Sequence, residues 1–92
     1  MDKIGTSPPE TGSDDAAGRG VDAVERALKL LNAFTSGGTG LTLKELASRS
    51  DLNKATILRL SVSLERFGYL MRDENGLYHL GPTLWRLGSE FR

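Results

Sequence analysis

The chain has 92 residues, with twelve basic and twelve acidic side chains, one histidine and no cysteine. This length allows one small domain. Without cysteine there can be no disulfide framework, no cysteine-ligated zinc site and no thiol nucleophile. No apolar run is long enough to cross a bilayer, and the polar N-terminus lacks the pattern of a signal peptide. We therefore expect a cytoplasmic protein that does not contact a membrane and holds no metal or cofactor.

Residues 1–20 are expected to form a disordered tail. They contain Pro8, Pro9 and the acidic pair Asp14-Asp15, and apart from Met1 their only large apolar side chain is Ile4. Such a segment cannot bury enough apolar surface to offset its conformational entropy. The tail has two basic and four acidic residues, whereas residues 21–92 have ten basic and eight acidic residues. The remainder of the chain is thus slightly basic, which matters for binding to phosphate.

The first predicted helix runs from Val21 to about Thr35. Its apolar residues have the i, i+3, i+4, i+7 spacing of a helix with one buried face, and Ala23 and Leu30 widen that face. We interpret this face as part of the core rather than as a partner-binding surface. It consists of Val24, Ala27, Leu28, Leu31 and Phe34.

Residues 43–67 predict a helix-turn-helix. Thr42 and Glu45 have the spacing of a capping box, so the first helix of the helix-turn-helix begins at residue 43 and ends near residue 49 or 50. Leu52 is expected to be the buried residue of the turn, and Asn53 is a suitable N-cap for the second helix. That helix is predicted over residues 54–67, with Gly68 as the residue that ends it.

The second helix has an apolar face and an exposed basic face. Lys54 and Thr56 lie in its first turn, where the backbone N–H groups favour an anion. Residues 53–72 contain four basic residues and one acidic residue, although a solvated helix face would explain this charge about as well. The predicted buried residues are Ile57, Leu60, Leu64 and Phe67; the predicted exposed residues are Ala55, Arg59, Val62 and Arg66, with Leu58 at the margin.

A β-hairpin and a last helix are predicted after Gly68. Asn75-Gly76 indicates the tip of a hairpin over residues 69–80, and two loop lengths are open. A three-residue loop with a bulge at Gly76 is favoured because it puts Leu70, Tyr78 and Leu80 on one face. Gly81-Pro82 then begins a helix over residues 82–92 whose apolar surface needs a partner. That surface consists of Leu84, Trp85, Leu87 and Phe91.

Together these elements predict a mostly α fold with a small β-hairpin, a winged helix-turn-helix over residues 21–81. The chain resembles the N-terminal DNA-binding domain of the IclR-type bacterial transcription regulators in three stretches, VERALKLLNAF, GLTLKELASRSDLNKATILRLSVSLERFGYL and NGLYHLG. The resemblance implies binding to double-stranded operator DNA as a dimer or tetramer. It also implies a linker helix used in dimerisation, here residues 82–92, and a larger C-terminal domain, absent here, that binds a small effector.

The resemblance also implies residue roles. By position, Lys54, Thr56 and Arg59 belong to the recognition helix, and three residues are expected to contact the DNA backbone, namely Thr42, Lys44 and Arg72. Asn53, Ala55 and Leu58 complete the predicted DNA surface, since a helix entering a groove reads bases from its first turns. Family members often have serine at residue 55, leucine at residue 61 and a basic side chain at residue 77, where this chain has Ala55, Ser61 and Leu77.

Two other classes of function stay open on the sequence. A winged helix used for protein–protein interaction would keep the fold without needing Lys54 and Arg59. An RNA-binding module usually exposes aromatic residues or a sheet platform, and neither is predicted. His79 is interpreted as a surface residue of the wing, and Asp73-Glu74 as a solvated pair at a turn, so no catalytic residue is assigned.

Overall fold

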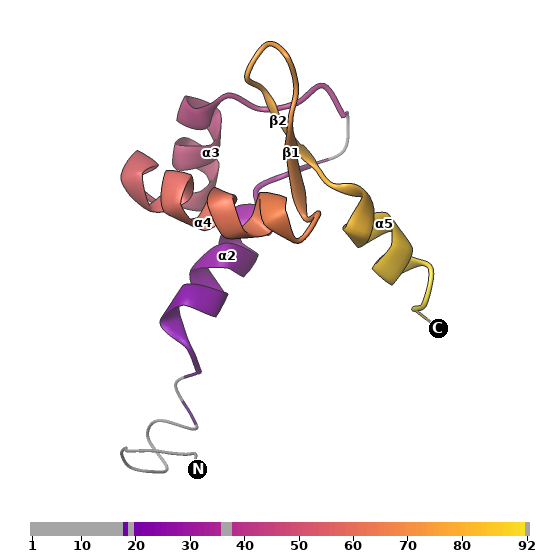
Figure 1. Cartoon of the computed structure of the whole chain (residues 1–92). Coiled ribbons are helices and arrows are strands. Elements are labelled where there is room, and N and C mark those ends of the chain that lie inside the picture. Colours follow the sequence, from indigo (N-terminus) through magenta and orange to yellow (C-terminus); the bar gives the residue numbers. More distant parts are fainter. Residues whose placement is uncertain (1–17, 19, 36–37, 92) are drawn as a thin grey trace.

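The computed structural model describes residues 18, 20–35 and 38–91. The predicted disordered tail lies almost wholly outside these residues. Within these residues, four helices and one antiparallel hairpin follow one another in the predicted order (Figure 1). They are α2 (Asp22–Asn32), α3 (Leu43–Ser50), α4 (Lys54–Arg66), β1 (Leu70–Arg72), β2 (Tyr78–Leu80) and α5 (Pro82–Gly88).

The predicted caps fix the starts of α3 and α4. The Glu45 N–H donates to Thr42 Oγ1 at 3.0 Å, and the Thr42 N–H donates to Glu45 Oε1 at 2.8 Å, which confirms the capping box. The Thr56 N–H donates to Asn53 Oδ1 at 2.8 Å, so Asn53 is the N-cap of α4. Between the helices, Asp51 ends α3 in the left-handed region with φ 63°. These local interactions set the boundaries of the helix-turn-helix.

One hydrophobic core joins the helices α2, α3 and α4 to the hairpin. Figure 1 shows the C-terminal end of α2 reaching the crossing of α3 and α4, with the hairpin beyond them. Two buried serines, Ser50 and Ser61, satisfy their hydroxyl groups within their own helices by donating to Leu46 O and Ile57 O. The core residues are Leu30, Ala33, Leu41, Leu46, Ile57, Leu70 and Tyr78.

The predicted buried face of α2 is wrong in part. Leu30 and Ala33 are the buried residues, whereas Val24 and Leu28 are about half exposed. The reason is that α2 enters the core only with its C-terminal part, where Leu30 is buried, while its N-terminal part extends outward (Figure 1) and borders an open hollow beside the turn between α3 and α4. Helical spacing identifies an apolar stripe, but only the neighbouring elements decide how much of it is covered.

The end of α4 also differs from the prediction. The helix stops at Arg66, and Phe67 is 69% exposed rather than buried. Gly68 adopts φ +82°, its N–H donates to Glu65 O, and the Tyr69 N–H donates to Leu64 O. These are the two hydrogen bonds of a Schellman motif, which turns the chain and directs Phe67 toward solvent.

The hairpin has the predicted three-residue loop. Leu70 pairs with Leu80 and Arg72 with Tyr78, so Leu70, Tyr78 and Leu80 share one face as predicted, although Leu80 stays 45% exposed. The Asp73 N–H donates to Leu77 O, and Gly76 adopts φ +82° in the loop between them. Leu41 adds an antiparallel bridge to Tyr78, which joins the start of α3 to the wing.

The last helix is shorter than predicted. It begins at Pro82 as expected but ends at Gly88, where Ser89 forms the C-cap. Phe91 therefore lies beyond the helix, and Arg92 lies outside the described residues. None of the helices in the described ranges is long and apolar enough to cross a membrane.

Candidate nucleic-acid interface

The exposed face of α4 carries four of the nine predicted DNA-binding residues. Lys54 and Ala55 are exposed in its first turn, and one turn later Leu58 and Arg59 are exposed on the same helix. The first turn contains no acidic residue, so the positive end of the helix dipole and the Lys54 ammonium group act together. This end of α4 can therefore hold a phosphate while the next turn reaches base edges.

Thr56 does not share this exposure. Only 8% of its surface is accessible, and the residue lines a hollow between the start of α4 and α2. Its backbone N–H is already used by the Asn53 side chain. The sequence placed Thr56 in the first turn correctly but could not tell that its side chain is directed away from solvent, and we exclude it from the candidate interface.

The caps of α3 and α4 bring further polar groups to the surface. Thr42, Lys44 and Asn53 are all exposed. The capping interactions use the Thr42 hydroxyl and the Asn53 side-chain oxygen as acceptors, so the hydroxyl proton of Thr42 and the amide N–H groups of Asn53 can still be donated. Hydrogen-bond donors of this kind position a protein on the DNA backbone.

Arg72 is already engaged within the protein. Its guanidinium group stacks over the ring of Tyr78, with 4.8 Å from Cζ to the ring centroid, and lies 3.8 Å from Glu65 Oε2 on α4. The side chain thus covers a buried tyrosine and links the wing to α4. A phosphate contact from Arg72 would compete with Glu65, which makes it a weaker candidate than Lys54 or Arg59.

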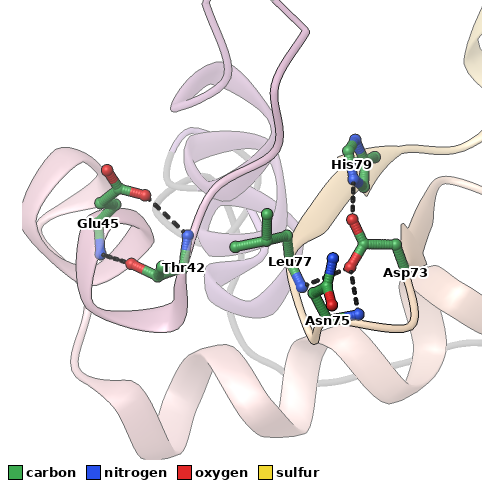
Figure 2. Close-up of polar contacts among 6 residues, drawn as sticks. All are labelled: Thr42, Glu45, Asp73, Asn75, Leu77 and His79. Atoms are coloured by element: carbon green, nitrogen blue, oxygen red, sulfur yellow. Dashed lines mark hydrogen bonds and ion pairs between the residues drawn. The ribbon is translucent and has the colours of Figure 1, made fainter.

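The loop of the wing is organised by one carboxylate (Figure 2). Asp73 Oδ1 accepts the backbone N–H groups of Asn75 and Leu77 at 2.9 and 3.0 Å, and Asp73 Oδ2 lies 2.8 Å from His79 Nε2. The hydrogen bond from His79, followed by that from the Leu77 N–H, lowers the pKa of Asp73.

Figure 2 also shows the capping box of Thr42 and Glu45 across Leu77 from this loop. The backbone N–H of Thr42 likewise lowers the pKa of Glu45.

Asp73 and His79 have other roles in the structure than the sequence predicts. The predicted solvated pair Asp73-Glu74 is split, because Asp73 holds the loop while Glu74 is exposed. His79 is a partner of this carboxylate rather than an isolated surface residue. An aspartate that begins a hairpin loop and is followed by Asn-Gly was the available signal, since its side chain commonly accepts backbone N–H groups two residues on.

The surface of α5 has the apolar character that the sequence predicted. Trp85 is 80% exposed and Phe91 86% exposed, Leu87 is exposed, and Leu84 is partly buried. Leu84 and Trp85 also line an open apolar hollow with Met71 and Leu80 of the hairpin. No residue of α5 is buried, so the helix offers most of its surface to a partner.

Comparison with known proteins identifies this arrangement. The sequence model of the IclR helix-turn-helix domain matches residues 23–74, which include all but the first residue of α2, the whole of α3, α4 and β1, and the start of the wing loop. The chain belongs to the IclR family. The matched unit is the helix-turn-helix of these regulators, and residues 54–66 are its second helix.

Relatives and solved structures agree with this assignment. The HTH-type transcriptional regulator BhcR of Paracoccus denitrificans is 37% identical over 87% of the chain, and XynR of Escherichia coli is 35% identical over 74% of the chain. An IclR family transcriptional regulator from Brucella abortus superimposes with a TM-score of 0.72 at 36% identity over 88% of the chain. The chain spans 28%, 27% and 31% of the lengths of these three proteins.

Proposed function

We propose that this chain binds operator DNA with α4 as the recognition helix. The observation that carries the proposal is the exposed first half of α4, which presents Lys54, Ala55, Leu58 and Arg59 and has no acidic residue in its first turn. The exposed guanidinium group of Arg59 suits guanine in the major groove, and Leu58 offers an apolar contact for a thymine methyl group. The phosphates on either side of these bases are contacted by Lys54, Thr42, Lys44 and Asn53.

Dimerisation through α5 and its C-terminal extension to Phe91 belongs to the same proposal. Operators with two-fold symmetry are read by two-fold proteins, and the exposed surface of Leu84, Trp85, Leu87 and Phe91 is suited to a second copy. A regulator of this kind acts on DNA in the bacterial cytoplasm. Any small-molecule effector is expected to bind the C-terminal domain typical of the family rather than this DNA-binding unit.

The test is a pair of binding titrations on random duplex DNA and on an operator selected from a duplex library, each at two salt concentrations. Affinity of the parent chain falls steeply with salt because phosphate contacts release counterions. Lys54→Ala weakens binding to both duplexes and reduces the salt slope by about one. Arg59→Ala loses roughly 1–3 kcal/mol on the operator and much less on random DNA, because a base contact is lost.

Arg49→Ala is the charge-matched control. Arg49 lies in the last turn of α3, where its guanidinium group donates to Thr35 Oγ1, away from the capped start of that helix. This variant should bind both duplexes as the parent does. If all three variants bind like the parent, or if the parent shows no salt-dependent affinity, the winged helix serves protein–protein interaction instead.

A further inference from the structure

The junction between α4 and α5 contains three hydrogen bonds that the DNA-binding surface does not use. The carbonyl groups of Phe67, Gly68 and Tyr69 follow α4 directly, and each accepts a hydrogen bond from the segment that begins α5. Thr83 Oγ1 donates to Phe67 O at 2.9 Å and the Thr83 N–H donates to Gly68 O at 3.0 Å. The Gly81 N–H donates to Tyr69 O at 2.8 Å. We call these five residues the α4–α5 junction.

Two glycines make the close approach in the α4–α5 junction possible. Gly81 has φ −86°, which any residue can adopt, yet a Cβ atom there would overlap the carbonyl oxygen of Gly68. A Cβ atom on Gly68 would overlap the hydroxyl oxygen of Thr83, and Gly68 also has a positive φ. The two backbone segments therefore lie closer together than any side chain allows.

The junction is not needed to end the recognition helix. The Schellman hydrogen bonds from Gly68 and Tyr69 to Glu65 and Leu64 already satisfy the last turn of α4. The hydrogen bonds from Gly81 and Thr83 use a second set of carbonyl groups and add a connection to α5. No residue of α5 is fully buried and Leu84 is only partly so, which leaves these hydrogen bonds a large share in holding the direction of the helix.

We propose that Thr83 is a positioning residue that sets the angle between α5 and the recognition helix α4. Both its hydroxyl group and its backbone N–H bind carbonyl groups at the end of α4, so α5 cannot turn without breaking them. In a dimer joined through α5, this angle determines the separation and orientation of the two recognition helices. Thr83 thereby determines the half-site spacing that the dimer accepts, a consequence that rests on the proposed function.

The angle itself can be measured without DNA. The chain has no cysteine, so Ser48→Cys on α3 and Arg86→Cys on α5, both at exposed positions, give two unique sites for spin labels. Pulsed electron paramagnetic resonance on the labelled chain should give a narrow distance distribution for the parent and for Thr83→Ser, which retains the hydroxyl group. Thr83→Val has the same shape without the hydroxyl group, and its distribution should be clearly broader.

A matched pair of glycine substitutions tests the close approach. Gly81→Ala should shift or broaden the distribution, because the added Cβ atom forces the two backbone segments apart. Gly88→Ala is the control within the same helix, since a Cβ atom there meets nothing within 4 Å. Thermal midpoints are recorded for all variants, and Thr83→Val keeps the proposal testable if Gly81→Ala does not fold.

The consequence for DNA is tested with the selected operator and with operators whose half-sites are one base pair closer or farther apart. The parent and Thr83→Ser should prefer one spacing. In Thr83→Val, the ratio of affinities for the preferred spacing and the altered spacings should fall roughly three- to tenfold, which is the effect of one hydrogen bond. Its affinity for a single half-site should stay unchanged.

Each outcome bears on a defined claim. A distance distribution of Thr83→Val as narrow as that of the parent overturns the positioning role. A broader distribution with an unchanged spacing preference overturns the link to DNA recognition. If the parent does not bind DNA at all, the proposed function fails, and the resonance measurement alone still decides whether Thr83 positions α5.

Discussion

Ile57 and Leu58 are adjacent in α4 and have opposite environments. Ile57 is completely buried in the core, whereas Leu58 is 44% exposed on the face proposed to contact DNA. A helix rotates by about 100° per residue, so neighbouring apolar residues can belong to different surfaces. The two positions therefore separate the contribution of apolar side chains to folding from their contribution to recognition.

We expect Ile57→Ala to destabilise the domain by about 2–5 kcal/mol, since it leaves a cavity in a core that contains few large side chains. Leu58→Ala should cost less than about 1 kcal/mol, because its side chain is partly hydrated already. Chemical denaturation of both variants provides the measurement. Equal losses of unfolding free energy would contradict the orientation of α4, and a loss of operator affinity confined to Leu58→Ala would support its contact with DNA.

At the scale of elements, the wing depends on one charged group. The Asp73 carboxylate accepts two backbone N–H groups of its own loop and pairs with His79 on the opposite strand. Its lowered pKa means that the ionised carboxylate is more stable in the folded chain than in the unfolded chain. The stability contributed by this group is present above the ordinary pKa of aspartate, about 3.9, and is lost as the pH falls through the lowered value.

We therefore expect Asp73→Asn to lower the thermal midpoint by a few degrees at pH 7 and to match the parent at strongly acidic pH, where the carboxylate is protonated. Glu74→Gln changes the neighbouring exposed charge and is the control. Midpoints of the parent and both variants should be recorded from pH 7 down to the acid transition. A parallel pH dependence in Asp73→Asn and the parent would show that this carboxylate does not stabilise the wing.

Elements whose limits depend on local chemistry were predictable from the sequence. The caps at Thr42 and Asn53, the end of α4 near Gly68 and the three-residue loop of the hairpin all depend on residues close in the chain. For the candidate site, exposed Lys54 and Arg59 followed from helical periodicity.

Features that depend on distant segments were not predictable. The exposure of Val24 and Leu28 depends on which part of α2 meets α3 and α4, and the burial of Thr56 depends on the core beneath α4. The engagement of Arg72 by Glu65 requires the wing to lie against the recognition helix. Sequence spacing describes one element at a time, so it cannot supply these relations.

At the scale of the whole molecule, helices α2 and α5 each carry an exposed apolar surface. One is on α2, with Val21, Val24 and Leu28, and the other is on α5, with Trp85 and Leu87. Figure 1 shows these two helices projecting from the domain in different directions. A dimer could use either surface, and the two would hold the recognition helices at different separations.

We expect the α5 surface to join two copies on DNA, because α5 is connected to the end of the recognition helix and can therefore fix the roughly 34–36 Å between two half-sites. Trp85→Ala/Leu87→Ala should abolish cooperative two-to-one binding to a palindromic operator while half-site affinity is retained. Val24→Ala/Leu28→Ala on α2 is the matched control and should stay cooperative. Analytical ultracentrifugation with and without operator gives the stoichiometry.

Because the α5 surface is small, self-association of the chain should be weak without DNA and should be promoted by DNA through linkage. Loss of cooperativity in the α2 variant alone would place the dimer contact on α2 instead.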